Sequence, residues 1–599
     1  MTLRTLLAPL LVAATLAAPL SAVAQRRPAP RPAPAPRPAA PRTGVTPTLF
    51  DNPALAQRYA ATITPEDLAA HLYFYASDAL EGRETGTRGQ HIGALYIATQ
   101  YRRLGLTPMG NAPGTDMRAP ERYFQPFTVY GQRLVRAALT ATRDGQTVAS
   151  ATFGAGQQNR DMMPAFASAA GASGGVVFGG YGIADSTLGY NDLAALRQAG
   201  VALQGKWVLM LADEPMRDAS TSLLRTADGK PSRWTTSATD KIRALIPSGV
   251  AGVLVVGDQS LRTTAPFADR VAAASMASAS AIGNLSLNRP AEGAPARRGF
   301  PPVYTVSSAF ANALLSGTGQ TVEALKAQID GSLRPVVMDV PGVTLDNTYE
   351  RRVFEAQTEN VAAMLEGSDP VLKNEVVVVS AHLDHIGLSP SNPTDQINNG
   401  AEDDGSGTVA LLELAEAFAK AKADGHGPRR SILFLNVTGE EKGLLGSAYF
   451  ADVDPLVPLA SIAANLNIDM IGRFDPTEPN RSQNYVYIIG SNLISQELDQ
   501  INTRANVAIG SNVELSQRFN TREDPNQFYR RSDHWNFGKK NIPFVFYFTG
   551  THEDYHGVGD EPQKIEYPRM SRIARLVFGT AWQVANQTAR PAVSGTGFN

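Results

Sequence analysis

Cysteine is absent from the 599-residue sequence, and its absence excludes several kinds of chemistry. The chain has no disulfide, no lipidated cysteine, no thiol nucleophile and no thiolate metal site. Any bound metal must therefore be held by histidine, aspartate, glutamate or backbone oxygen. Only eight histidines occur, so few imidazoles are available for such a site.

A strong charge of one sign is also missing. The formal net charge is −2, which gives no bulk electrostatic reason to expect nucleic acid or an anionic membrane as a partner. Hydrophobic residues make up 43% of the chain and charged residues 18%, a balance typical of a globular protein with a substantial core. At roughly 100–200 residues per domain, the length predicts more than one domain.

Long apolar runs are missing beyond the N-terminus, so we expect no membrane span in the mature chain. Arg4 precedes "LLAPLLVAATLAAPL", an apolar stretch that is short for a membrane-spanning helix, and "AVA" follows at 22–24. This order predicts a signal peptide over residues 1–24, with cleavage after Ala24 and export to the periplasm or the exterior. An uncleaved membrane anchor is the alternative.

Three stretches of different character follow. Residues 25–47 form a Pro/Ala/Arg-rich linker that we expect to be extended. From about Thr64 to Leu106 the pattern is helical: "TPEDLAAHLYFYAS" opens with a threonine cap and a proline in the first turn, and "GQHIGALYIATQYRRLGL" is amphipathic. Residues 127–337 show short strands with Gly-rich turns and no dense cluster of His, Asp and Glu, as in a lid, a docking module or a structural β-rich insert.

From about Thr358 the chain alternates strands with helices, which predicts an α/β fold with a parallel sheet. Four of the predicted strands end in residues that can bind a metal. "NEVVVVSAH" leads to His382, Asp384 and His385, "RRSILFLNV" to Glu440 and Glu441, "LASIAANLNID" to Asp469, and "IPFVFYF" to His552, Tyr555 and His556. Because ligands bind at the carboxyl ends of the strands in such sheets, we expect these residues to converge.

A fifth piece, "NNGAEDDGSG", carries Glu402, Asp403 and Asp404 directly before the predicted helix over residues 408–422. Taken alone it reads as an ordinary acidic helix start, since a helix N-terminus favours negative charge. Together with the four strand ends, it adds carboxylates to a predicted metal site.

Imidazoles combined with carboxylates suit zinc. Two zinc ions that share one carboxylate need two histidines, two terminal carboxylates and one bridge. The sequence offers five residues for these places: His382, Asp403, Glu441, Asp469 and His556. Glu440 is then left beside a ligand, where a general base that activates a metal-held water belongs.

These motifs together resemble an M28-type zinc aminopeptidase, a co-catalytic di-zinc exopeptidase. The matching pieces are "SAHLDH", "GAEDDGSG", "TGEEKGLLGS", "NIDMIG" and "DYHGVGDE", which occur in the family's order over roughly residues 380–560. "LEGRETGTRG" and "GLTP" extend the resemblance to the N-terminal helices. Residues 127–337 resemble a protease-associated (PA) domain, which many members carry at this place.

The resemblance implies a three-layer α/β/α zinc-peptidase domain with a mostly parallel central sheet, plus an inserted β-rich PA-like domain. Residues 48–126 and 338–590 would form the peptidase domain, residues 127–337 the insert and residues 591–599 a C-terminal tail. His382, Asp403 and Asp469 would hold one zinc. Asp403, Glu441 and His556 would hold the other, with Asp403 as the bridge.

The resemblance also implies three catalytic roles. Glu440 would act as the general base. Asp384 would hydrogen-bond the far nitrogen of His382 and fix the orientation of that ring. Tyr555 would polarise the scissile carbonyl and stabilise the oxyanion.

The implied function is an exported aminopeptidase with two Zn²⁺ per chain, which removes N-terminal residues from peptide or protein substrates. The alternatives are a carboxypeptidase of the same fold and a glutaminyl-peptide cyclotransferase, which would use one zinc. A receptor-like protein without catalysis conflicts with the complete set of ligands. Among the remaining histidines, His71 and His91 are expected in packing or surface roles and His426 in a loop. His385 and His552 lie near the site, and we expect a supporting or surface role for them. Asp533 and His534, in "YRRSDHWNF", are expected in a structural role, with shaping of the substrate pocket as the alternative.

Overall fold

The computed structural model of the protein describes residues 49–594, apart from 114–115, 117–118, 155–159, 167–170, 281–282, 292–299, 390–391, 393 and 478–483. The predicted signal peptide and linker lie outside the described residues. The chain divides into two units, residues 1–49 and 50–599, and every element below belongs to the second. No helix in the described ranges combines the length and apolarity that a membrane crossing requires.

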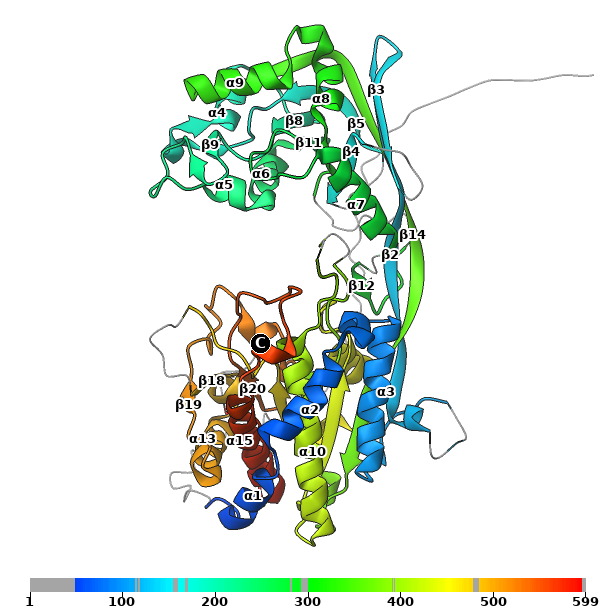
Figure 1. Ribbon diagram of the computed structural model, residues 1–599, viewed down its shortest axis with the longest axis vertical. Helices are drawn as coiled ribbons and strands as arrows, with labels where there is room; N and C mark the ends of the chain where they lie inside the picture. The colour runs from blue at the N-terminus through cyan, green and yellow to red at the C-terminus, as the bar shows by residue number, and fades with distance from the viewer. Residues whose placement is uncertain are drawn as a thin grey trace, which may run out of the picture. The chain divides into compact units, whose positions relative to one another are not determined.

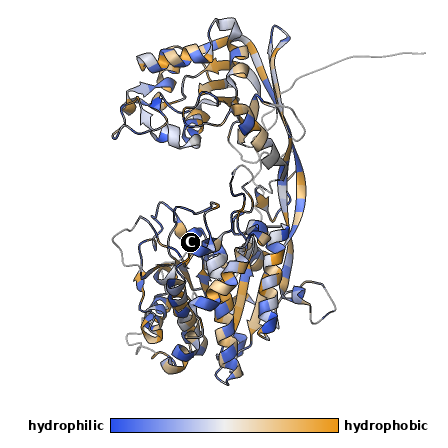
Figure 2. Ribbon diagram, in the orientation of Figure 1, coloured by the Kyte–Doolittle hydropathy of each residue, from blue (hydrophilic) through white to orange (hydrophobic). Residues whose placement is uncertain are grey.

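Four parallel strands form the centre of a sheet in the C-terminal half of the chain, called the C-terminal sheet below, as the sequence predicts (Figure 1). They are β16 (Ser431–Val437), β15 (Val376–His382), β17 (Ile462–Ile468) and β20 (Phe544–Phe548), in this spatial order. The residues of all four strands are buried, which matches their near-continuous apolar sequences. In Figure 2 the part of this sheet that is visible between α10 and α3 is largely orange, the colour of hydrophobic residues.

The flanking strands complete the sheet. Beyond β20 lie β18 (Tyr485–Ile489), which is antiparallel to it, and β19 (Glu514–Ser516). On the other side, the last residues of β14 (Met338–Leu365) pair antiparallel with β16. The sheet is therefore mostly parallel, with an antiparallel strand on either side of the central four.

Helices cover both faces of this sheet and make the fold three-layered. One face, which includes Val377 and Val379 of β15, packs against helices α1 (Pro53–Ala60), α2 (Pro65–Tyr75), α3 (Arg88–Arg103), α10 (Gly407–Ala423), α13 (Gln496–Ile509) and α15 (Tyr567–Asn586). The opposite face, with Val376 and Val378, packs against residues near α11 (Leu445–Ala448) and α14 (His534–Gly538). The strand's period of two accounts for this division, since successive side chains point to opposite faces.

The α2 helix begins as the sequence predicts. The Thr64 side chain accepts a hydrogen bond from the Asp67 amide, and Pro65 occupies the first turn. The amphipathic segment that follows becomes α3, whose C-terminus is reached just before Gly105 at a positive φ of 70°.

The segment between these helices and the C-terminal sheet has its own core. Strands β5 (Ser173–Phe178), β8 (Trp207–Leu211), β11 (Gly252–Val256) and β13 (Val303–Val306) run parallel, and β4 (Met162–Phe166) is antiparallel beside β13. The helices of this segment are α4 (Asp192–Gln198), α5 (Arg233–Thr236), α6 (Ala238–Leu245), α7 (Phe267–Ser280), α8 (Ser308–Leu315) and α9 (Val322–Ser332). "KIRALIPSGVAGVLVVGD" forms a helix and then a strand, α6 and β11, as predicted.

Two long strands join this segment to the C-terminal sheet. Strand β2 (Phe124–Arg143) pairs antiparallel with β14. At one end of this ladder Phe124 is opposite Val361, and at the other end Arg143 is opposite Val343. Strand β3 (Gln146–Phe153) pairs with β2. The sequence pattern predicted only short strands here. The pairing is between segments some 200 residues apart, and a local pattern does not reveal it.

Candidate metal centre

The candidate site lies where the four central parallel strands end (Figure 1). His382 is the last residue of β15, and Asp469 follows directly after β17. Glu440 and Glu441 lie three and four residues beyond β16, and His556 lies on the loop after β20. Asp403, the fifth predicted ligand, lies in the turn directly before α10, so all five are brought to one edge of the sheet from different segments.

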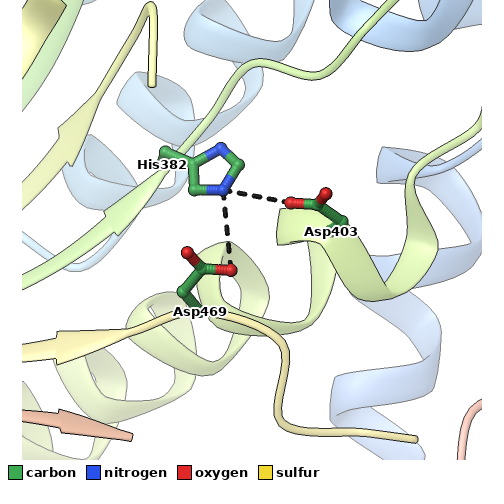
Figure 3. Close-up of side chains that lie close together, drawn as sticks. All are labelled: His382, Asp403 and Asp469. Carbon is green, nitrogen blue, oxygen red and sulfur yellow. Dashed lines mark ion pairs between the residues drawn. The ribbon is translucent and has the colours of Figure 1, made fainter. Parts of the chain in front are cut away.

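His382, Asp403 and Asp469 form the first group of donors (Figure 3). The His382 Nε2 atom lies 3.2 Å from Asp403 Oδ1 and 3.7 Å from Asp469 Oδ1. All three side chains are buried, yet His382 Nε2 has no hydrogen-bond partner among the described residues. An imidazole nitrogen and two carboxylate oxygens that converge without hydrogen-bonding one another form a donor set that can hold a cation.

Asp403, Glu441 and His556 form a second group. The His556 Nε2 atom lies 3.0 Å from Asp403 Oδ2 and 3.1 Å from Glu441 Oε2. His556 has a left-handed backbone at φ 55°, a conformation that is costly for a non-glycine residue. Its side chain is 37% exposed, so the second group is the more accessible of the two.

Asp403 belongs to both groups, with one oxygen toward each. Oδ1 faces His382 and Oδ2 faces His556. This is the arrangement expected of a carboxylate that bridges two metal ions.

A third imidazole, that of His385, lies within the second group. His385 Nδ1 is 3.0 Å from Glu441 Oε1 and 3.9 Å from Asp403 Oδ2. From the sequence we expected this residue in a supporting or surface role. The side chain is fully buried, so the surface alternative is wrong. Its position three residues after His382 was the only sequence signal for it.

The side chain of Asp404, the neighbour of Asp403, binds backbone amides. Its carboxylate accepts hydrogen bonds from the amides of His382 (3.1 Å), Gly407 (2.8 Å) and Met470 (3.2 Å). Burial and the nearby Asp469 raise the pKa of this carboxyl well above its usual range. Asp404 thus holds the ends of β15 and β17 against the start of α10.

Glu402 and Asp560 support the same loop from the other side. Asp560 accepts hydrogen bonds from the amides of Glu402 and Asp403, at 3.0 and 3.1 Å. The Glu402 carboxylate accepts from the amides of Gly472 and Arg473, both at 2.8 Å. Burial and Asp560 raise the pKa of Glu402 to about 7. Sequence reasoning assigned no role to Asp560, which lies 157 residues from Asp403.

Asp384 differs in detail from its predicted role. The His382 Nδ1 atom lies 3.1 Å from the backbone oxygen of Asp384 and 3.7 Å from its carboxylate. The carboxylate instead accepts from the Thr85 hydroxyl (2.7 Å) and the Glu440 amide (3.2 Å). These two donors hold the carboxylate, so the backbone oxygen makes the closer contact with the ring. Asp384 therefore positions the Glu440 backbone as well as His382.

Glu440 and Tyr555 line a pocket beside the two groups. Its polar floor includes Asp403, Glu440 and Asp469, and its apolar wall consists of Met470, Phe528, Phe546 and Phe548. Burial raises the pKa of Glu440 well above its usual range, and the negative charge of Glu441 adds to the rise. A carboxyl group in this setting holds a proton readily.

The Tyr555 hydroxyl accepts a hydrogen bond from the Arg531 guanidinium at 3.0 Å. The Tyr555 ring stacks on His556, with 3.9 Å between ring centroids. Because Arg531 occupies a lone pair of the hydroxyl oxygen, the O–H bond is free to donate into the pocket. Both Arg531 and Tyr555 line that pocket.

The remaining histidines lie outside the two groups. His71 contacts Tyr96 and Glu413, and His91 contacts Glu359. His426 lies against Tyr59, and His552 is buried on the loop that carries His556. His534 is buried behind the apolar wall of the pocket, stacked on Phe546.

Residues 360–581 match the model of peptidase family M28. A curated relative, "Probable zinc metalloprotease" of Pyricularia oryzae, is 26% identical over 284 residues, which cover 41% of this chain and 53% of that protein. A "probable leucine aminopeptidase 2" of Aspergillus oryzae is 28% identical over 225 residues, with coverage of 37% and 39%. The match thus spans about half the length, or less, of these curated relatives.

Among solved structures, the chain aligns with an aminopeptidase from Aneurinibacillus sp. strain AM-1, with a TM-score of 0.48, 16% identity and coverage of 90% of this chain and 99% of that one. A zinc aminopeptidase from Bacillus subtilis has a TM-score of 0.47, 16% identity and coverage of 89% and 98%.

Proposed function

Because residues 360–581 match the model of peptidase family M28, we propose that the protein is an exported di-zinc aminopeptidase that hydrolyses N-terminal residues from peptides. The observation that carries this proposal is the position of Asp403, with one carboxylate oxygen toward His382 and the other toward His556. A carboxylate placed between two sets of donors is what a pair of metal ions requires.

The residues fit zinc, since the donors are imidazole nitrogens and carboxylate oxygens and His382 Nε2 is buried without a hydrogen-bond partner in the described part of the chain. His382, Asp403 and Asp469 would hold one ion. Asp403, Glu441 and His556 would hold the other. When bound, zinc polarises a carbonyl oxygen as a Lewis acid and lowers the pKa of the water bound to it to about 7.

Glu440 would take the proton of the attacking water and return it to the departing amine. Its carboxyl group lines the pocket, and its backbone is held by Asp384, so the side chain is positioned without being one of the grouped donors. Tyr555 would donate its hydroxyl hydrogen to the carbonyl oxygen as negative charge develops there.

We infer cleavage at a free N-terminus from the relatives that are named aminopeptidases. The apolar wall of the pocket suits the first side chain of such a substrate. If N-acetylated leucyl peptides were cut as fast as the free peptides, the aminopeptidase assignment would be wrong. C-terminal release would then favour the carboxypeptidase alternative.

Export and the PA-like insert also belong to this proposal. The signal sequence over residues 1–24 would be removed after Ala24, and residues 127–337 would form the insert between the two parts of the peptidase domain. Mass spectrometry of the mature N-terminus tests the first point. An exported form that retains Met1 would indicate an anchor instead.

Two neighbouring glutamates provide the main test of the mechanism. Glu441→Gln replaces a charged donor of the second group and should lower zinc content. Glu440→Gln should retain two zinc ions per chain and reduce kcat roughly 10²–10⁴-fold, as expected when a general base is removed. Glu416→Gln, at an exposed position paired with Arg103, serves as the matched control.

Zinc content by metal analysis and turnover of leucyl amide are measured on the same preparations. If Glu440→Gln lost zinc while Glu441→Gln retained it, the two glutamates would have the opposite roles. Near-normal turnover in both would refute the mechanism, and full activity of the wild-type protein with one zinc ion would refute the shared bridge.

A further inference from the structure

The His385 imidazole is the least explained group at the centre. It is fully buried, and neither of its ring nitrogens has a hydrogen-bond partner among the described residues. A buried imidazole without partners is costly, because its polar atoms have lost water and gained nothing in return. One nitrogen, Nδ1, nevertheless lies 3.0 Å from Glu441 Oε1.

The closeness of these two atoms without a hydrogen bond is informative. Glu441 Oε1 also lacks a hydrogen-bond partner in the described structure, so the pair approaches without the alignment that an N–H donor and an oxygen acceptor adopt. Two donor atoms take such positions when both point at a common cation.

The surrounding backbone holds the ring in this position. The His385 amide donates to the Arg83 carbonyl at 3.1 Å. Gly400, at φ 59°, lies so close that an added Cβ would be 2.5 Å from His385 Cδ2. The ring is therefore clamped between the segment around Arg83 and the loop that carries Asp403, with Nδ1 toward Asp403 and Glu441.

The distances suit a complete shell around one ion. Donors at the corners of a zinc tetrahedron are roughly 3.3–3.4 Å apart when the bonds are about 2.0–2.1 Å long. The two contacts of His556 are 3.0 and 3.1 Å, and those of His385 are 3.0 and 3.9 Å. Glu441 presents one oxygen to each imidazole, Oε1 to His385 and Oε2 to His556.

We propose that His385 is a further metal ligand, which completes the second group with Asp403, Glu441 and His556. This inference rests on the proposed di-zinc centre and makes its two sites unequal. The second site would be held by four side chains, as in a structural zinc site, whereas His382, Asp403 and Asp469 would leave a position open for the reaction.

The first experiment measures metal retention of the full chain. Zinc-loaded wild-type protein, His385→Ala and His385→Gln are titrated with a chelator, and bound zinc is counted. Loss of His385 should weaken retention of one of the two ions by about 10–100-fold or more, while the other ion is retained as in the wild type. His552→Gln, which alters a buried histidine outside both groups, should match the wild type.

A crystal structure with anomalous zinc scattering separates ligation from indirect support. Ligation places His385 Nδ1 about 2.0–2.1 Å from the ion. A distance beyond 3 Å, with Nδ1 hydrogen-bonded to Glu441, would overturn the proposal, as would unchanged retention in both His385 variants.

These outcomes are distinct from failure of the proposed function. Wild-type protein with two zinc ions and no peptidase activity would refute the function and leave His385 testable by the same titration. Wild-type protein that binds no zinc would refute both. Two ions bound with His385 outside the shell would refute only this inference.

Discussion

His534 provides a quantitative test of the structure through the pH dependence of stability. It is buried in α14, and its ring stacks on Phe546, with Phe544 4.9 Å away. Nε2 lies 2.9 Å from the Tyr529 carbonyl, which can only accept, so Nε2 carries the hydrogen. Nδ1 is buried without a hydrogen-bond partner in the described structure, so the protonated ring would bury a second, unsatisfied N–H group.

Burial lowers the pKa of His534 to about 3, against a smaller opposing effect of the hydrogen bond to Tyr529. In the unfolded chain the pKa is about 6.5. Between these values the unfolded state binds more protons than the folded state, so stability rises with pH and is lost as pH falls below about 6.5. At 1.36 kcal/mol per pKa unit, lowering the pH from 7.5 to 5.0 should cost about 2 kcal/mol at this residue alone.

The assay compares the wild-type protein with His534→Gln, whose amide can still donate to Tyr529. Urea unfolding is followed by fluorescence at pH 7.5 and 5.0, with Trp535 and Trp582 as reporters in the peptidase part. Other titrating groups contribute equally to both proteins, so the wild type should lose about 2 kcal/mol more than the variant, with an unchanged m-value. Equal losses within about 0.5 kcal/mol would show that His534 does not remain uncharged in the folded state.

Three further predictions concern the site. Thr85→Val removes the hydroxyl that binds Asp384 and should weaken zinc retention about 10–100-fold in a chelator titration, whereas Thr85→Ser should restore it. Arg531→Met and Tyr555→Phe should each lower kcat, and the double variant should lose no more than the worse single one, because the two act through one hydrogen bond; additive losses would contradict this. A panel of aminoacyl amides should show higher kcat/KM for leucine and phenylalanine than for aspartate and lysine, since the pocket wall is apolar, and the reverse order would place the first side chain elsewhere.

The sequence was sufficient to predict the parts of the fold that repeat a local pattern. "NEVVVVSAH" and "RRSILFLNV" became buried parallel strands because β-branched and apolar runs of this length suit the centre of a sheet. Since parallel strands end at one edge, residues such as His382 and Asp469 had to meet there once the strands were identified. The strand positions therefore determined much of the predicted ligand set.

Spacing alone did not separate neighbouring acids on one loop. Asp403 and Asp404 are equivalent in composition, and the choice of Asp403 came from the family resemblance. The structure shows the difference: Asp404 is turned to three backbone amides, while Asp403 faces two imidazoles. Which of two adjacent side chains faces the site depends on the local backbone, and composition does not encode it.

The sequence by itself determined which strands end in residues that can bind a metal, because hydrophobic periodicity and residue type are local properties. Only the tertiary structure decided the place of His385, the support of Asp384 by Thr85 and the hold of Asp560 on the loop of Asp403. Thr85 and Asp384 are 299 residues apart, and Asp560 and Asp403 are 157 residues apart. His385 lies beyond the strand, where alternation no longer sets the direction of a side chain. Folding brings such partners together, and their distances in space are independent of their distances along the chain.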